Sequence, residues 1–432
     1  MERLVHNMFG SLLWKECKMW LKSIIFYAYI ILLFLFYVTQ MGEGTAFVKP
    51  QPDWDDYGMV YSEDERVIMN GTLKDLIEDY GSGYFPTYPV GFYKKVILAD
   101  QEMSILGDCI SELTGMTKEQ WEKEYDRYLD GLDGYSGYMD EQDQLVEEEK
   151  VPWSLVVSEQ LTYKEFKEIM KKVSDIIGPG SEYSESRLKS HGIVPKTYEQ
   201  AMAGYEEILE KDRVTGAYAR LFSDYIGIVL GILPAFFVVT RGIKDRRNQV
   251  SGVIYSKQIS SGTIVLSRYL AMIIMMILPV LAVSCLSMAQ SLYIANSVGV
   301  VPDYFAYVKY VAGWLLPTIL FVSALAFVVT ELTESMIGIL VNGIAWFSAV
   351  LLGVSNSALI NAGWNLIPRF NELGEYKLFQ EMFPQLICNR CFYTVFSLCI
   401  IVLCVVIYDK KRRGGYQIHG KIFKNSHSKC EA

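Results

Sequence analysis

Apolar residues are concentrated in six long runs, and polar or charged residues separate each run from the next. Each run has about the 20 mostly apolar residues that a helix needs to cross the hydrocarbon core of a membrane. One such run could be a buried core helix, but six in one chain with basic flanks favour membrane spans. The runs cover residues 23–41, 221–240, 269–295, 310–330, 336–354 and 392–408. The pattern predicts an α-helical integral membrane protein with six transmembrane helices, because only a helix satisfies its own backbone in lipid.

The first run could instead be a signal peptide, since its apolar part is short enough for one. No A-x-A cleavage site follows it, and 22 residues precede it. It is therefore predicted to be a retained anchor, the first span (residues 23–41). In residues 1–22, apolar positions recur near helical spacing, and lysines cluster close to Trp14 and Trp20. This pattern favours a helix in the cytoplasmic interface of the membrane; the alternative is a plain extension of the first span.

The longest polar segment, residues 42–220, separates the first two runs and is long enough for a domain of ordinary size. Residues 51–61 and 81–92 are rich in Gly, Pro and aromatic residues, which is typical of loops and turns. Alternating strand patterns are scarce, so we expect a mostly helical domain of α or α+β class. Helical periodicity is found in residues 117–129, 162–177 and 195–212.

Charge divides the chain at the same boundaries. The block from Glu43 to Arg220 holds 37 acidic and 19 basic residues, a net charge of −18, whereas the rest holds 12 acidic and 21 basic residues, +9. Lys and Arg near span ends stay cytoplasmic. With six spans, the basic N-terminus, stretch 241–268 and tail 409–432 all fall on that side. The sequence thus predicts a multi-pass protein of the cell membrane with cytoplasmic termini and an extracytoplasmic domain, residues 42–220.

Three further features modify this plan of spans in residues 221–408. Pro234, Pro279 and Pro317 lie within runs, where proline can kink a helix. Asp224 opens the second span near the outer interface, where we expect it to reach water. Residues 355–390 are semi-apolar and contain two prolines. They are expected to form an outer segment of short helices that rest on or dip into the outer leaflet.

Motifs for chemistry are missing from the sequence. It holds no P-loop, no H-E-x-x-H and no G-x-S-x-G, and its four histidines are scattered. Cys388 and Cys391 form a C-x-x-C, but no second pair accompanies them. No span carries the ladder of ionisable residues of a proton relay or voltage sensor. The chain is therefore predicted not to be an enzyme, to bind neither a metal nor nucleic acid, and to receive energy from outside.

The basic stretch 241–268 carries the most specific pattern. It runs from an acidic–basic cluster (Asp245, Arg246, Arg247) through a short helical segment (Val250, Val253, Ile254) and a turn (Tyr255, Lys257, Ile259) to Arg268, just before the third run. Its order, together with the large insertion after the first span, resembles ABC-2 type transporter permeases, most of all bacterial members with a large extracytoplasmic domain between spans one and two. Gln258 stands where proline is more usual in that family. The residues that carry the resemblance are Asp245, Arg246, Arg247, Val250, Val253, Ile254, Tyr255, Lys257 and Ile259.

The resemblance implies that residues 241–268 form a coupling loop that docks on a separate ATPase subunit. That subunit would bind ATP and Mg²⁺, and this chain would bind no cofactor. The same nine residues are the expected ATPase contacts, joined by Glu331 and Glu334 in the turn after the fourth span. Six spans are half of such a transporter, so a second copy or a paralogue is expected as dimer partner, with export as the direction. The pattern leaves the substrate-binding residues unknown.

Other interpretations stay open at this point. A membrane-anchored receptor or sensor could bind a ligand with the acidic domain, although the sequence holds no cytoplasmic signalling domain. A self-sufficient ion-coupled carrier would need buried charges or an inverted repeat in its spans, and neither is evident. The basic stretch could also be a retention loop without a partner. Its apolar helical face and the missing energy source favour docking.

Overall fold

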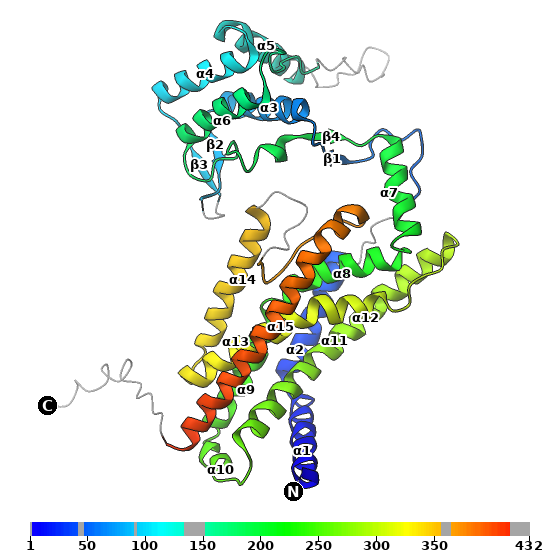
Figure 1. Cartoon of the computed structure of the whole chain (residues 1–432), viewed down its shortest axis with the longest axis vertical. Coiled ribbons are helices and arrows are strands. Elements are labelled where there is room, and N and C mark those ends of the chain that lie inside the picture. Colours follow the sequence, from blue (N-terminus) through cyan, green and yellow to red (C-terminus); the bar gives the residue numbers. More distant parts are fainter. Residues whose placement is uncertain (1, 42–46, 90–92, 134–151, 356–363, 415–432) are drawn as a thin grey trace, which may run out of the picture. The chain divides into compact units, whose positions relative to one another are not determined.

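The computed structural model describes residues 2–41, 47–89, 93–133, 152–355 and 364–414. They form two compact units. Residues 50–201, with 354–358, make the first, which we call the inserted unit; residues 1–49, 202–353 and 359–432 make the second, which we call the bundle unit. Helix dominates both of them (Figure 1). The prediction of a mostly helical protein is therefore confirmed, although both unit boundaries differ from the predicted limits 42 and 220.

The inserted unit is built from helices around one apolar core, with two small sheets at its edge. The core gathers side chains such as Trp121, Phe85 and Phe166, all fully buried. Strand β1 pairs antiparallel with β4, and β2 pairs antiparallel with β3. The elements are β1 (Met59–Tyr61), α3 (Glu65–Ser82), β2 (Phe85–Thr87), β3 (Lys94–Val96), α4 (Asp100–Thr114), α5 (Lys118–Asp133), α6 (Tyr163–Ile177), η2 (Leu188–His191) and β4 (Ile193–Pro195); α7 (Tyr198–Glu210) leads into the bundle unit.

Local chemistry explains which of these helices the sequence predicts. Helix α6 begins at a capping box, where the Thr162 side chain accepts from the Glu165 backbone and the Glu165 carboxylate accepts from the Thr162 backbone. Helices α5 and α6 are found where predicted, and α7 begins at Tyr198 because residues 193–195 pair as strand β4. Helices α3 and α4 were not predicted. Two segments predicted as loops each contain a three-residue strand, β1 and β2.

The bundle unit holds the apolar helices. Four of its described helices are long and apolar enough to cross a membrane, and the bent pair α8–α9 makes a fifth if it counts as one span. The helices are α1 (Glu2–Trp20), α2 (Ile24–Met41), α8 (Thr215–Leu230), α9 (Leu233–Arg247), α10 (Ser251–Tyr255), α11 (Ser261–Ser297), α12 (Ala306–Tyr310), the π-helical turn η3 (Val311–Leu315), α13 (Leu316–Thr333), α14 (Ile337–Ser355) and α15 (Tyr376–Arg412). Helix α14 is the shorter apolar helix at the fifth predicted run.

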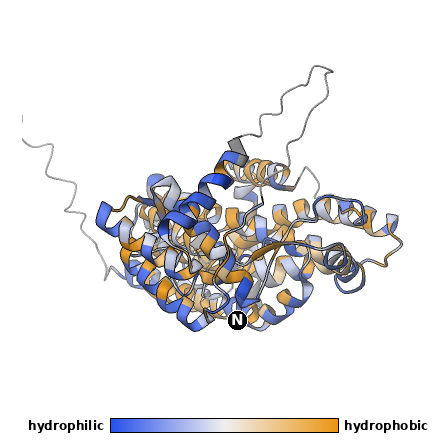
Figure 2. Ribbon diagram, turned by 90° about the horizontal axis from the view of Figure 1, so that it is seen from above, coloured by the Kyte–Doolittle hydropathy of each residue, from blue (hydrophilic) through white to orange (hydrophobic). Residues whose placement is uncertain are grey.

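Large apolar side chains lie exposed on the outside of the bundle. They include Ile24 and Ile31 on α2, Leu278 on α11, Leu340 on α14 and Val402 on α15. Figure 2 colours the ribbon by hydropathy. Exposed apolar surface on this scale, carried by helices of membrane length, indicates insertion into a membrane.

The long helices run between two ends of the bundle unit. Helices α8 and α9 lead to α10, and α11 leads away from it. Helices α12 and α13 run back to the α10 end, because Glu331 and Glu334 near the end of α13 pair with Lys411, which lies next to α10 on α15. At the other end, which we call the far end, the Asp303 backbone donates to Thr215 at the start of α8. Helix α15 starts near that end and finishes beside α10.

The second predicted run is broken between α8 and α9, which meet at 41°. Gly231 lies at the break, where a Cβ would stand 2.5 Å from Ile367 and 2.8 Å from Trp346. Pro234 follows in the first turn of α9 and lacks the N–H that would continue the α8 hydrogen-bond ladder. The predicted kink at Pro234 is therefore confirmed. Pro279, in contrast, lies inside the uninterrupted helix α11, and Pro317 lies in the first turn of α13.

Two predictions around the outer segment are wrong. Residues 376–390 are not short separate helices but the first turns of the continuous helix α15, which tolerates Pro384 because Phe379, Met382 and Leu386 pack it onto the bundle core. Asp224 does not reach water: it is fully buried, and its carboxylate accepts from Arg369 Nε at 2.9 Å and from the Phe370 backbone at 2.7 Å. These bonds satisfy a charge that would otherwise be costly to bury.

Candidate functional site

The predicted coupling loop folds into one short helix, α10, between α9 and α11. Helix α9 continues to Arg247, and Gln249 then turns the chain with a left-handed backbone, φ 55°. Helix α11 begins after Ser260, whose hydroxyl accepts from the Thr263 backbone at 3.0 Å. The helical part of the loop is therefore five residues long, because strong helix boundaries on both sides leave only residues 248–260 between the flanking helices.

Arg412, at the end of α15, holds α10 in place. Its guanidinium donates to the backbone carbonyls of Tyr255, at 2.9 Å, Lys257 and Ile259. These are the carbonyls that the end of α10 and the following turn leave without a helical partner. The Tyr408 ring, one turn earlier on α15, packs edge-on against Tyr255 with centroids 5.6 Å apart. Helix α10 is thus fastened to α15 by both polar and aromatic contacts.

A buried ionic network lies directly behind α10. Arg241 on α9 donates to Glu16 of α1 at 2.6 Å and to Asp245 at 2.8 Å, and Arg268 on α11 donates to Asp245 at 2.5 Å. The Arg241 side chain is only 7% exposed, so removing one partner would leave an uncompensated charge in a low-dielectric setting. The network therefore couples α1, α9 and α11 at the α10 end.

The predicted second contact, the turn after α13, joins the same end. Lys411 on α15 lies 2.9 Å from the Glu334 carboxylate and 3.7 Å from that of Glu331, and it also donates to the Glu331 backbone. A cavity of about 160 Å³ separates these groups from Ile254 and Tyr255 on α10. Burial, and next the nearby Glu331 carboxylate, raise the pKa of the Tyr255 hydroxyl to about 12, so it stays neutral at physiological pH.

The predicted contact residues divide between two faces of the loop. Asp245, Ile254, Tyr255, Ile259 and Glu331 face the bundle or its ionic groups. The exposed face carries Arg247, Val250, Val253 and Lys257, and Val253 is 60% exposed. Glu334 lies at the edge, with a side chain 39% exposed. The Arg246 side chain lies outside the described residues.

Sequence reasoning missed the residues that hold this arrangement. Arg241, Lys411 and Arg412 were counted only as basic residues that set orientation, and Glu16 was not singled out, although each bonds to another helix. One signal was available: Arg241 and Asp245 are four residues apart, the spacing of a helical ion pair. The contacts of Arg412 with residues more than 150 positions earlier carried no local signal.

The described residues contain no group of three or more His, Cys, Asp or Glu side chains arranged to hold a metal ion. Cys388 and Cys391 lie one turn apart on α15 as free, exposed thiols. That this chain binds no cofactor itself stays a prediction.

The chain was compared with protein-family models, with curated proteins and with solved structures. None of the three comparisons gives a match.

Proposed function

We propose that this chain is the membrane-spanning permease subunit of an ABC transporter of the ABC-2 type, and that it exports its substrate with energy from a separate ATPase subunit. The observation that carries the proposal is the arrangement of exposed and anchored residues around α10. The short helix α10 and the residues next to it expose Val250, Val253 and Lys257 to solvent, while Arg412 bonds the carbonyls of Tyr255, Lys257 and Ile259 to α15. Exposed apolar side chains next to a lysine, on a helix held from behind, fit a docking surface for a protein partner.

The directions of the helices support six membrane crossings in this proposal. Helices α13 and α15 both finish at the α10 end, whereas α15 starts near the far end. The chain between Glu334 and Tyr376 must therefore return to the far end, and α14 is the helix that runs there. Its 19 residues span about 28 Å at 1.5 Å per residue, close to the ~30 Å thickness of the hydrocarbon core. Both termini and α10 would then share the cytoplasmic side, opposite the acidic inserted unit.

The contacts behind α10 suggest how a displacement of α10 would be transmitted to the membrane helices. Arg412 connects α10 to α15, Lys411 connects α15 to the end of α13, and Arg268 connects α11 to Asp245 on α9. A displacement of α10 by the ATPase would thus move four helices together, because each ion pair is held between partly or fully buried side chains. A second copy or a paralogous chain would complete the translocation path, and the lipid membrane would surround both.

The proposal is tested by purifying the tagged full chain from its native membranes in mild detergent. Proteins that accompany it are identified, and ATP hydrolysis by the complex is measured. The decisive variant is Val253→Glu with Lys257→Glu, since both side chains are exposed and neither supports the fold. Val301→Glu with Lys377→Glu is the matched control at the far end, where Val301 is 73% exposed and Lys377 is exposed and lies outside the cavity lining.

The expected result is that a P-loop ATPase accompanies the wild-type chain and the control. The α10 variant should lose at least about 90% of the accompanying ATPase, because two carboxylates placed in the interface, one of them in place of a lysine, cost several kcal/mol of binding free energy. If the α10 variant retains the ATPase as well as the control does, docking at α10 is wrong. If no P-loop protein accompanies the wild-type chain, the transporter proposal itself fails, and a receptor role for the inserted unit becomes the leading hypothesis.

A further inference from the structure

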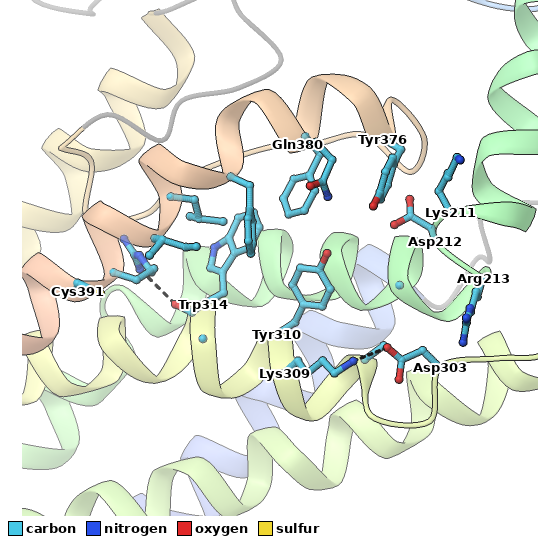
Figure 3. Close-up of a pocket in the computed structure, with 18 residues that line it drawn as sticks. Lys211, Asp212, Arg213, Asp303, Lys309, Tyr310, Trp314, Tyr376, Gln380 and Cys391 are labelled. Atoms are coloured by element: carbon cyan, nitrogen blue, oxygen red, sulfur yellow. Dashed lines mark hydrogen bonds and ion pairs between the residues drawn. The ribbon is translucent and has the colours of Figure 1, made fainter.

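A large cavity in the described part of the bundle unit lies at the far end, and it has no part in the α10 site. Its volume is about 720 Å³, within the range of roughly 300–1,000 Å³ that holds small organic ligands. Its walls come from the start of α8, from α12 with η3, and from the first turns of α15 (Figure 3). About 20 residues of α15, from Cys391 in the lining to Arg412 beside α10, separate the two sites, which is about 30 Å of helix at 1.5 Å per residue.

Aromatic rings form the middle of the cavity wall. Trp314 and Phe379 stack with their planes 2° apart, and Tyr310 packs against both rings with centroids 6.2–6.3 Å away. Phe379 also contacts Phe383. Rings held by one another in this way form a rigid apolar surface, which suits an aromatic or acyl group of a ligand. The backbone of this wall is unusual too, because Gly313 and Trp314 lie in a π-helical turn, a feature frequent at functional sites.

The charges along the cavity do not balance. Asp212 is neutralised by Arg220, which donates to both of its carboxylate oxygens at 3.0 and 2.8 Å, and Asp303 is neutralised by Lys309 at 2.7 Å. Among the described residues, no ion pair is formed by the two remaining basic side chains at one end of the cavity, Lys211 and Arg213, although the charge of Arg213 acts on Asp303 together with that of Lys309. Figure 3 shows both at the same end. The lining is therefore cationic once its internal ion pairs are counted.

Two buried polar groups lie at the opposite end of the cavity, Arg390 and the indole of Trp314. Arg390 is only 5% exposed, and every acceptor that it reaches in the described structure is neutral, including the backbone of Trp314 and the hydroxyl of Thr318. Its N–H groups are already bonded to these acceptors, so Arg390 raises the positive charge of the lining without offering a donor to a ligand. The indole N–H of Trp314, which is 2% exposed, has no acceptor among the described residues. Its nitrogen has almost no exposed surface, so an acceptor in the cavity could reach it only after the wall shifts.

The backbone at the cationic end is held in an uncommon conformation. Arg213 and Val214 both have positive φ, 52° and 61°. For a β-branched residue such as Val214 this is a genuine outlier, and such backbones persist where the surrounding structure demands them, often at ligand sites. Here it places Arg213 beside the cavity directly before α8.

We propose that this cavity binds an amphipathic anion, with the anionic head near Lys211 and Arg213 and an apolar or aromatic body on Trp314 and Phe379. The head would be a phosphate or carboxylate, either of a membrane lipid or of a soluble amphiphile. The inference does not rest on ATPase docking, because binding to the chain alone tests it.

The test uses the full chain in a neutral maltoside detergent. Octyl phosphate, below its micellar concentration, is titrated by calorimetry, and 1-octanol serves as the uncharged probe. In parallel, the chain is placed in nanodiscs of phosphatidylcholine with phosphatidylglycerol, and retained lipids are counted by native mass spectrometry. Gly313→Trp fills the cavity, since no atom lies within 4 Å of a Cβ at that position; Gly343→Trp adds the same side chain on α14, where space is equally open. Lys211→Gln with Arg213→Gln removes the basic end, and Lys377→Gln removes an exposed charge outside the cavity lining.

Octyl phosphate is expected to bind at least about tenfold more tightly than octanol, with an affinity that falls as salt rises. The double charge variant should weaken it by roughly tenfold, and Gly313→Trp should abolish it, whereas Gly343→Trp and Lys377→Gln should bind as wild type does. Selective retention of phosphatidylglycerol, lost in the same variants, would identify a lipid as the source; binding of octyl phosphate without lipid retention would identify a soluble amphiphile. Equal binding of octanol and octyl phosphate, or unchanged binding in Gly313→Trp that folds normally by size exclusion and thermal melting, overturns the proposal.

Discussion

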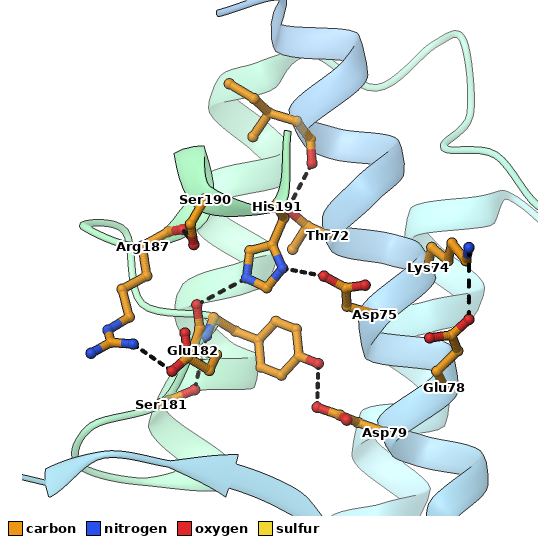
Figure 4. A network of polar contacts seen from close by, with 12 residues as sticks. Thr72, Lys74, Asp75, Glu78, Asp79, Ser181, Glu182, Arg187, Ser190 and His191 are labelled. Carbon is orange, nitrogen blue, oxygen red and sulfur yellow. Dashed lines mark hydrogen bonds and ion pairs between the residues drawn. The ribbon is translucent and has the colours of Figure 1, made fainter. Parts of the chain in front are cut away.

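At the residue scale, the inserted unit contains one polar network whose protonation matters for stability (Figure 4). The Tyr183 hydroxyl donates to Asp79 at 2.5 Å, and the His191 ring bonds Asp75 at 2.5 Å and the Glu182 carbonyl at 3.1 Å. Burial raises the pKa of Asp79 to about 6, against the lowering effect of the Tyr183 bond. Burial alone would lower the pKa of His191, but its bonds to Asp75 and Glu182 outweigh burial and raise it.

The network predicts that the inserted unit becomes less stable as pH rises. Both folded-state pKa values lie above the unfolded ones, so each group contributes stability that is complete below its unfolded pKa and is lost as pH rises through the folded one. For Asp79 this stability is lost between about pH 4 and pH 6, and for His191 the loss starts above about pH 6.5. Because Asp79 is partly exposed, its share is only about 1 kcal/mol. Glu78, which burial also shifts upward in pKa, and Arg187, which pairs with Glu182, complete the charged surroundings.

Hydrogen exchange of the full chain in nanodiscs checks this, with peptides from α3 compared at pH 5 and pH 8 after correction for the intrinsic rate. Asp79→Asn keeps an acceptor for Tyr183 but cannot titrate, and it should flatten the part of the pH dependence below pH 6. Asp108→Asn, an exposed residue on α4, should leave the whole profile as in wild type. A wild-type α3 equally protected at both pH values would show that the network does not control stability.

At the element scale, α10 is too short to be stable alone, since an isolated helix of five residues forms few internal hydrogen bonds. Its order therefore depends on Arg412 and on the packing of Ile254 and Tyr255. Arg412→Gln removes three bonds from a charged donor to backbone carbonyls, each of which contributes about 1.5–3 kcal/mol. We expect the free energy of local opening of residues 251–260 to fall by about 3 kcal/mol, the lower limit for the two bonds that glutamine cannot replace.

Hydrogen exchange of peptides that cover α10 measures this effect as faster exchange. Arg413→Gln is the matched control: it neutralises the neighbouring arginine, whose side chain is 77% exposed and pairs only within α15, with Asp409. Slow exchange of α10 in Arg412→Gln, equal to that in the control, would mean that apolar packing alone orders the helix. In that case the transmission path from α10 to α15 would need another contact.

Single elements also show where sequence reasoning reaches its limit. Helix α6 was predictable because its start is encoded locally, in Thr162 and Glu165. Helix α3 was missed because its apolar residues follow no clean helical period, although its N-cap Asp64 and its C-terminal Gly83, with φ 72°, are both strong local signals. The continuous α15 was missed because Pro384 argues for a break locally, and only packing against the bundle core keeps the helix intact.

At the scale of the whole molecule, the division into two units was readable from hydropathy and charge, because both depend on composition over long stretches. The candidate site was only partly readable. The loop between α9 and α11 was found through its charges, and Asp245 does join the ionic network. The carboxylate of Asp224 was expected to meet water and instead holds Arg369, 145 residues away. Which acidic side chain pairs with which basic side chain depends on how helices distant in the sequence pack, and a single sequence does not contain that information.

The path of the chain through the membrane gives the last prediction. If α14 crosses, the helix directions put α10 and the end of α15 on one side of the membrane, which the proposed function makes the cytoplasmic side, with the inserted unit outside. Single cysteines at Lys95 on β3, at Gln258 after α10 and at Arg413 after α15, each in a cysteine-free chain, report this through an impermeant maleimide. Lys95→Cys should react in intact cells, whereas the other two should react only after permeabilisation. Reaction of Arg413→Cys from outside, with Gln258→Cys protected, would contradict the six-crossing path, because the contact of Arg412 with α10 requires both positions on one side of the membrane.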